Sequence, residues 1–479
     1  MTELHYYELL EISQYGLDGI DENSDSHTWA LFQGLLGLSL LQILFQRSEE
    51  DFSRPIYHFK NALRLLSVHE YAVECTAIQI GLGDAYLNNI GSDRAGQIEL
   101  AIETFEISIS QLSNDTHPVQ WAQLNIRLGN AYQKRLHGSR LENLHLAIKA
   151  YDRGLILLLE KELPEEWVVG SINLATAITE LPPGHDERNV QWAIDIYLNV
   201  LKVIDHKFKG THRLKIRTLK NLAGIYVDLA ELTAAEEIYV QLLTHLKRTL
   251  LNSPLDYATT LDSLASLYVE TERFELAENY YKEAIFFLSQ FIDSDNLVVV
   301  GIMNNLAVLY SATNRYSYAE TLFKEVIEIR QRKLGDFDPD LANTLNNLAD
   351  VYKNIGNHSR AEELYSRALE INVKLLGWHH PNVATVLNNL GLLNYSLGRL
   401  DLAITQIQKA LQISEETLGN DHHKVAIRLV NLAGLYRATG MVDQSFQLLT
   451  RAISIGKSRF GNDSAIVKHA LALLDNQNE

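Results

Sequence analysis

The sequence contains little proline and a single cysteine, and both shortages narrow the possible structures. Its 479 residues include 8 prolines and one cysteine, Cys75. Few prolines leave helices uninterrupted. A lone cysteine excludes an intramolecular disulfide and a cysteine-based metal site. We therefore expect a helix-compatible chain from a reducing compartment, which points to the cytoplasm.

The sequence also lacks an excess of positive charge. It carries 42 Lys and Arg against 60 Asp and Glu, a formal net charge of -18. Because neutralising nucleic-acid phosphates requires a basic surface, nucleic acid is disfavoured as a partner. Hydrophobic residues make up 46% of the chain, which indicates a folded protein instead of a disordered one.

One long uncharged stretch, from Trp29 to Phe45, needs a test as a signal or membrane segment. No Lys or Arg precedes it, since the first is Arg47, and seven acidic residues stand where a signal peptide has positive charge. Gln33, Ser39 and Gln42 also interrupt the stretch. We expect a buried first helix and no membrane role.

A repeat of 42 residues organises the second half of the chain. A Tyr position recurs at this step, and an Ala position follows it by nine residues. The first series is Tyr226, Tyr268, Tyr310, Tyr352, Asn394 and Tyr436, and the second is Ala235, Ala277, Ala319, Ala361, Ala403 and Ser445. Apolar residues around both positions step by three and four, which indicates two amphipathic helices per repeat. Gly335 and Gly377 then suit a left-handed helix end, and Asp338-Pro339 suits the next helix start.

The first half repeats with a step of 46. Trp29, Cys75, Trp121 and Trp167 are in phase, as are Leu40, Tyr86, Tyr132 and Ile178. The second helices are marked by Pro55, Ala101, Ala147 and Ala193, fifteen residues after the Tyr position instead of nine. We interpret the six additional residues as an ordered hairpin loop, with apolar residues packed inside it at Phe52, Ile98, Leu144 and Val190.

The repeats predict four segments of chain. Residues 1–28 are an N-terminal capping segment, 29–205 hold four long-loop repeats, 206–462 hold six 42-residue repeats, and 463–479 form a C-terminal cap helix and tail. In the cap, Leu471 and Leu474 continue the first-helix phase. No Gly-, Ser- or Pro-rich linker separates the two sets of repeats, so we expect one continuous solenoid, weakest at 182–184 and 205–213.

The motif Leu-Gly/Ala-x-x-Tyr, followed by Ala, an aromatic residue and Ala, resembles the tetratricopeptide repeat. Tyr352, Ala361, Tyr365 and Ala368 match it in full. Across about 210–462 the chain resembles the 42-residue repeats of kinesin light chains, and the first four repeats resemble those of CHAT-associated tetratricopeptide proteins. The resemblance implies an all-α, right-handed superhelical solenoid of about ten tetratricopeptide-type repeats with a C-terminal capping helix.

The function implied is a non-enzymatic scaffold that binds a peptide segment or partner domain in its concave groove. The alternative is a regulatory or adaptor subunit that controls a separately encoded enzyme, for example a CHAT-type peptidase. An enzyme in its own right is disfavoured, because no phosphate loop, nucleophile elbow or convergent acid and base is visible. We expect no catalytic residue, metal or cofactor, and the oligomeric state is not predicted.

Several other features have structural readings. His380 and His422 lie 42 residues apart, which favours equivalent polar turns over a metal site. Gly81 and Gly83 suit close helix packing, and the Tyr series suits the hairpin core. Trp378 lies in a turn outside this phase, where a contact role is more plausible.

Asparagines on the first helices are the candidate binding residues. The positions six and five residues before the Tyr position hold three pairs: Asn304 and Asn305, Asn346 and Asn347, and Asn388 and Asn389. Because first helices line the concave face of tetratricopeptide arrays, such a ladder of amides can hold an extended backbone. We expect Asn304, Asn346 and Asn388 to be exposed in the groove. The alternative of hydrogen bonds to neighbouring repeats stays open for Asn221, Asn305, Asn347, Asn389 and Asn431.

Further donors surround these asparagines, and their charge suggests a class of ligand. They are Asn343, Lys353, Asn354 and Arg437, with Lys220 and Arg217 as a basic spot one or two repeats earlier. Together they favour an acidic or C-terminal carboxylate ligand, against the opposing charges of Asp262, Glu270 and Asp350.

Overall fold

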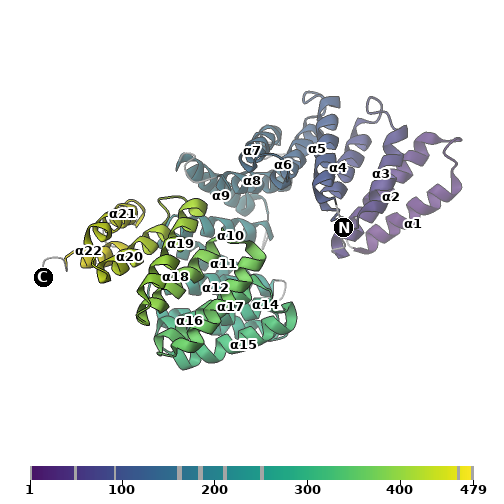
Figure 1. The fold of residues 1–479 in the computed structure, drawn as a ribbon. Coiled ribbons are helices and arrows are strands. Elements are labelled where there is room, and N and C mark those ends of the chain that lie inside the picture. Colours follow the sequence, from purple (N-terminus) through teal and green to yellow (C-terminus); the bar gives the residue numbers. More distant parts are fainter. Residues whose placement is uncertain are drawn as a thin grey trace. The chain divides into compact units, whose positions relative to one another are not determined.

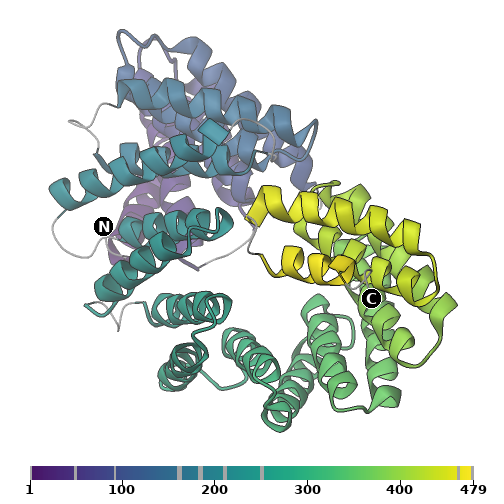
Figure 2. The ribbon, with the colours of Figure 1, turned by 90° about the vertical axis from the view of Figure 1, so that its left-hand side faces the viewer.

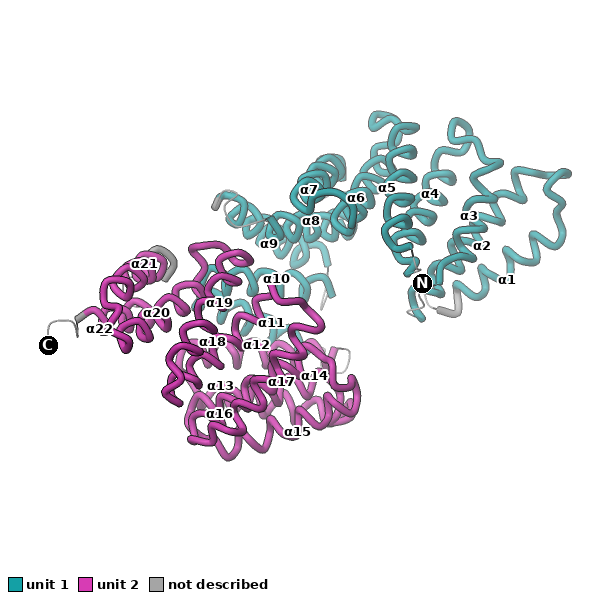
Figure 3. The backbone as a smooth tube through the Cα atoms, viewed as in Figure 1, with its two compact units in different colours: residues 1–249 teal, residues 250–479 magenta. Residues whose placement is uncertain are grey.

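The computed structural model describes residues 3–47, 51–90, 93–158, 164–181, 187–208, 213–248, 253–460 and 464–475. Within these ranges the chain forms 22 α-helices and no strand (Figure 1). The helices belong to two compact units, residues 1–249 and 250–479 (Figure 3). The predicted change of repeat step near residue 206 lies inside the first unit. The predicted weak point at 182–184, and residues 209–212 of the one at 205–213, lie outside the described residues.

Unit 1 begins with a single helix and continues as five helical hairpins. Helix α1 (Glu3–Gly19) packs against α2, and the hairpins pair α2 with α3, α4 with α5, α6 with α7, α8 with α9, and α10 with α11. Their bounds are α2 Ser26–Arg47, α3 Ser53–Leu65, α4 Ala72–Asn88, α5 Arg94–Gln111, α6 Pro118–Lys134, α7 Arg140–Leu157, α8 Pro164–Thr179, α9 Glu187–Lys207, α10 Arg213–Asp228 and α11 Leu232–Leu246.

Unit 2 contains five further hairpins and ends with a single helix. The hairpin helices are α12 Pro254–Glu270, α13 Phe274–Leu288, α14 Leu297–Ala312, α15 Tyr316–Leu334, α16 Pro339–Asn354, α17 His358–Leu376, α18 Pro381–Ser396, α19 Leu400–Leu418, α20 His423–Ala438 and α21 Val442–Phe460. They follow one another around a curve (Figure 2). The predicted capping helix is α22 (Ala465–Asp475), which packs on α20 and α21. Leu474 contacts that core, but Leu471 is exposed, and Val467 and Ala470 are the fully buried residues.

The repeat phase correctly predicted the core of the hairpins. All five alanines of the second-helix series are fully buried, and Ser445 is nearly so. Tyr268, Tyr310 and Tyr352 are buried, whereas Tyr226 and Tyr436 are half-buried. A buried tyrosine still needs a partner for its hydroxyl, and the Tyr352 hydroxyl donates to Glu320 Oε1 at 2.8 Å.

The predicted long hairpin loop of the first repeats is wrong. The connections α4–α5 and α6–α7 are five residues long (89–93 and 135–139), against three residues for α14–α15 and α16–α17 (313–315 and 355–357). Two of the six additional residues therefore lengthen the loop, and the other four add a turn to the second helix. Ile98 and Leu144 are buried because they lie inside those helices, and only Phe52 directly precedes one.

Helix α2 is the described helix that is long and apolar enough to cross a membrane. In the structure it packs against α1, α3 and α4. Its polar Gln33 is buried and lies 2.7 Å from His58 of α3. A polar side chain paired within the protein is typical of a helix in a protein core, as the sequence predicted. The close packing predicted for Gly81 and Gly83 is confirmed as well, since a Cβ on either would overlap the ring of Phe59 or Phe105.

The helix ends show where the 42-residue repeat requires glycine. Gly335 and Gly377 end α15 and α17 with φ of 81° and 79°, as expected, but with ψ of -170° and 167° they lie outside the left-handed helical region, in one that glycine alone adopts readily. The turns inside the hairpins have positive φ at one repeating position. Gly356, Gly398 and Gly440 occupy it in the later repeats, whereas Ala230, Glu272 and Asn314 occupy it in the earlier ones.

This repeating position predicts a paired change in stability. Gly356→Ala should lower the free energy of unfolding by about 1 kcal/mol, because alanine is strained at a φ of 80°. Space does not explain such a loss, since a Cβ at Gly356 would meet no atom within 4 Å. Glu272→Gly, the reverse change at a φ of 58°, should be neutral or stabilising. Denaturant unfolding measures both, and equal losses in the two variants would contradict this account.

Candidate functional site

Unit 2 has two faces with different packing. Neighbouring first helices contact one another along the series α12, α14, α16, α18 and α20, whereas successive second helices make no such contact among the described residues. The array therefore curves with its first helices on the inner side and its second helices on the outer side. Each face has a cleft that is a candidate site.

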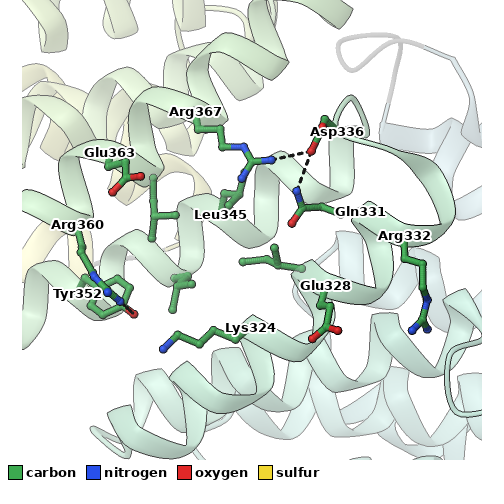
Figure 4. Close-up of a pocket in the computed structure, with 13 residues that line it drawn as sticks. Lys324, Glu328, Gln331, Arg332, Asp336, Leu345, Tyr352, Arg360, Glu363 and Arg367 are labelled. Atoms are coloured by element: carbon green, nitrogen blue, oxygen red, sulfur yellow. Dashed lines mark hydrogen bonds and ion pairs between the residues drawn. The ribbon is translucent and has the colours of Figure 1, made fainter.

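The outer cleft lies between α15 and α17 over a floor of α16 and has a volume of about 740 Å³ (Figure 4). Leu345, Leu348 and Tyr352 are part of its lining. Each of its four cationic side chains already has a partner: Lys324 with Glu320, Arg332 with Asp295, Arg360 with the Tyr352 hydroxyl, and Arg367 with Asp336. None of the predicted binding residues lines this cleft.

The inner cleft lies on α12, α14 and α16, and we call it the first-helix cleft. It has a volume of about 310 Å³ and is lined by Thr259, Asp262, Leu297, Val298, Gly301, Ile302, Asn304, Asn305, Arg330, Asp340, Asn343 and Thr344. Three of the predicted binding residues, Asn304, Asn305 and Asn343, thus line one cleft. No sequence pattern pointed to Gly301, Arg330 or Thr344, and Asp262 was expected only as an opposing charge.

The first-helix cleft offers unused hydrogen-bond donors. Asn304 Oδ1 accepts from the Thr344 hydroxyl at 3.2 Å, while its Nδ2 has no partner among the described residues. The exposed Asn343 amide likewise has none in that part of the chain. Arg330 is buried, and its Nη1 lies 3.1 Å from Asp338 and 3.0 Å from Asp340, but its Nε is buried without a partner. The Asn304 and Asn343 amides can therefore donate to a ligand that accepts hydrogen bonds, whereas Arg330 Nε is too deeply buried for a ligand to reach.

The cleft also contains a carboxylate without a cation. Asp262 Oδ1 accepts from Asn305 Nδ2 at 2.9 Å, and this is its one hydrogen bond within the described ranges. Burial raises the pKa of the Asp262 carboxyl, although the hydrogen bond from Asn305 acts in the opposite direction. The charged form of this group is therefore poorly solvated in the cleft.

The other predicted asparagines form a ladder between repeats. Asn389 Nδ2 donates to Asn346 Oδ1 at 3.1 Å and to Asp350 Oδ2 at 3.2 Å, and Asn431 Nδ2 donates to Asn388 Oδ1 at 2.9 Å. The alternative of hydrogen bonds between repeats is therefore confirmed for Asn221, Asn305, Asn389 and Asn431.

The expectation that Asn346 and Asn388 are exposed is wrong. Each is 8% exposed, because the donor on the next first helix covers it. Asn347 Oδ1 accepts from Asn346 of the same helix at 3.5 Å. Asn304 is thus the one of the three predicted groove asparagines with an amide left for a ligand.

The remaining predicted residues do not join the cleft. Lys353 Nζ pairs with Asp350 Oδ1 at 2.6 Å, Arg437 donates to the Leu473 carbonyl of α22, and Asn354 is exposed at the end of α16. Lys220 and Arg217 belong to α10 of unit 1, where Arg217 donates to Asn173 at 2.9 Å. Asn221 of the same helix bonds Thr176 and Tyr197.

The histidines lie in equivalent turns, as the sequence predicted, whereas a contact role for Trp378 stays a prediction. His380 and His422 each accept from a backbone N–H at 3.1 Å at the start of α18 and α20, so both are helix caps in equivalent turns. Trp378 is 47% exposed, with Lys409 Nζ 4.1 Å from its ring centre. No group of three or more metal-type ligands occurs among the residues that the structure describes.

Comparisons with known proteins agree with this repeat structure. Family models described as tetratricopeptide repeat match residues 258–285, 299–374 and 382–458, with a further match at 346–416. The predicted repeats are therefore confirmed in these residues. The likeness of the first four repeats to CHAT-associated proteins stays a prediction. A search of curated proteins finds no match.

Solved structures similar to the chain include other helical repeat proteins. BtubC (BKLC) from P. vanneervenii is 26% identical, covering 47% of this chain and 91% of that one, with a TM-score of 0.41. A putative kinesin light chain from Podosopora anserina is 21% identical, covering 42% and 95%, with a TM-score of 0.35. A Rap protein complexed with Competence and Sporulation Factor is 13% identical, covering 82% and 99%, with a TM-score of 0.50, which relates the folds alone.

Proposed function

We propose that this chain, whose residues 258–285 and 299–458 match tetratricopeptide repeat models, is a binding scaffold whose first-helix cleft receives an extended peptide segment of a partner protein. Arrays of such repeats are typically non-catalytic scaffolds that present curved binding surfaces. The observation that carries the proposal is that two amides without a partner among the described residues, Asn304 Nδ2 and that of Asn343, line one cleft. A peptide backbone supplies a carbonyl acceptor at every residue, so it matches this set without requiring one sequence.

The Rap protein of similar fold was solved with a bound factor, which is a precedent for ligand capture by helices arranged in this way. That likeness relates folds, so the support for the proposal comes from the cleft itself. A cleft volume of about 310 Å³ holds a short stretch of chain and not a folded domain. The partner would therefore present an extended segment.

Gly301 gives a direct test, because it lies inside α14 and lines the cleft. A Cβ at this position would meet no atom within 4 Å, so the free protein has room for a side chain there. Gly301→Leu should stabilise the chain by roughly 0.5–1 kcal/mol through helix propensity. The same side chain should fill the cleft and weaken peptide binding by about tenfold or more, since a ligand can no longer reach the donors.

The measurement is the retention of short random-sequence peptides by the immobilised full chain. Gly434→Leu is the matched control, because Gly434 is also inside a first helix, α20, with no atom within 4 Å of an added Cβ. The wild type and Gly434→Leu should retain peptides that Gly301→Leu does not. If Gly301→Leu retains the same peptides, the ligand does not use this cleft and the proposal fails.

A further inference from the structure

Asp262 occupies a repeating position at which the following repeats carry no charge. In steps of 42 residues the position holds Asp262, Asn304, Asn346 and Asn388. In the ladder, the side chain at this position accepts a hydrogen bond from the next first helix. Asn346 and Asn388 perform this task with a neutral amide oxygen, at 3.1 and 2.9 Å, and Asp262 performs it with a carboxylate oxygen at 2.9 Å.

The ladder therefore does not require the negative charge of Asp262. The charge is also unfavourable in the free protein, because the side chain is partly buried and no basic group forms an ion pair with it among the described residues. Arg330, the cation that lines the same cleft, already bonds Asp338 and Asp340. The fold neither needs nor neutralises this charge, which lies on the wall of a cleft. A charged group in such a place is suited to bind a ligand.

We infer that the peptide segment bound in the first-helix cleft brings a positively charged group to Asp262, either the side chain of a Lys or Arg or a free α-ammonium. This inference rests on the proposed function and defines the class of peptide. It reverses the expectation of an acidic or C-terminal carboxylate ligand. That expectation came from Lys220, Arg217, Lys353 and Arg437, none of which lines the cleft.

The geometry also suggests how the segment is held. The cation would displace water from Asp262 on α12, while carbonyls of the neighbouring residues accept from Asn304 on α14 and Asn343 on α16. Asp340 adds a second carboxylate to the cleft, and its side chain is 64% exposed. The lining holds two carboxylates and one arginine, and Arg330 pairs with Asp340 but not with Asp262. The negative charge left on the cleft favours a basic segment over an acidic one.

Asp262→Asn is the variant that isolates the charge. It gives position 262 the residue that the next three repeats have, retains an oxygen for Asn305, and should leave the thermal midpoint unchanged or higher. Glu363→Gln is the matched control, because it removes a carboxylate from the outer cleft.

The probe is a synthetic library of short random-sequence peptides with amidated C-termini, in one set with free and in another with acetylated N-termini. Peptides retained by the wild-type full chain should be enriched in Lys and Arg, or should require the free N-terminus. A selected peptide should bind Asp262→Asn about tenfold or more weakly, as expected for the loss of a charged hydrogen bond, and bind Glu363→Gln with unchanged affinity. Loss of binding on acetylation assigns the cation to the α-ammonium, and retention assigns it to a side chain.

The outcomes separate the inference from the proposed function. Suppose that peptides bind the wild type but not Gly301→Leu. If neither set is then enriched in Lys and Arg or requires a free N-terminus, or if the peptides bind Asp262→Asn with equal affinity, the inference is overturned and the cleft stays the binding site. A wild-type chain that retains no peptide, or peptides that Gly301→Leu retains equally, overturns both.

Discussion

Asn389→Ala should lower the free energy of unfolding by about 2 kcal/mol, while Asn304→Ala should change it by less than about 0.5 kcal/mol. Asn389 donates to Asn346 and Asp350, and its removal leaves two partly buried acceptors without a donor. Asn304 accepts one hydrogen bond, from the Thr344 hydroxyl, whose single hydrogen can be donated instead to the nearer Asp340 carbonyl at 2.9 Å. Truncation of Asn304 therefore leaves no buried group unpaired.

The two variants should have the opposite order in peptide binding. Asn304→Ala removes a donor from the first-helix cleft and should weaken a retained peptide, whereas Asn389 lies outside the cleft. Denaturant titrations followed by circular dichroism measure the stabilities, and titration with a retained peptide measures the affinities. A large loss of stability in Asn304→Ala, with none in Asn389→Ala, would contradict the assignment of ladder and cleft.

This contrast shows how far the sequence alone could predict the site. The step of 42 residues placed Asn304, Asn346 and Asn388 in equivalent positions, and equivalence suggested one shared role. The hydrogen bonds instead join residues 43 apart, from Asn389 to Asn346 and from Asn431 to Asn388. The step of 43 depends on how far neighbouring first helices are shifted along their axes. The periodicity within a single helix does not determine this shift.

The repeating phase was sufficient for the fold, because core positions depend on periodicity within one helix. The helical pairs, the buried alanine series and the capping helix α22 followed from it. The additional residues of the first repeats were misplaced for a related reason. An apolar residue such as Ile98 or Leu144 has the same spacing in a packed loop and in one more turn of helix, and the sequence did not distinguish the two. The contributions of Gly301 and Arg330 depend on which atoms surround them, so no local pattern could mark them.

A fragment of residues 250–479 should fold without the rest of the chain. In a helical repeat array each hairpin is stabilised by its neighbours, and this unit holds five hairpins with α22 covering the last. We expect a soluble, almost purely helical fragment by circular dichroism, with a cooperative denaturant transition. Trp378, the sole tryptophan in this part of the sequence, is 47% exposed in the turn before α18, so its fluorescence reports on that turn. A fragment that starts at residue 316 is the matched control, because it begins with the second helix α15 and lacks its partner α14, whose Leu306, Leu309 and Tyr310 are buried. It should be less stable than the longer fragment or aggregate through the exposed apolar face of α15.

If the fragment of residues 250–479 is itself aggregated or unfolded while the full chain is folded, then unit 2 depends on unit 1 for stability, and the two units form one cooperative body.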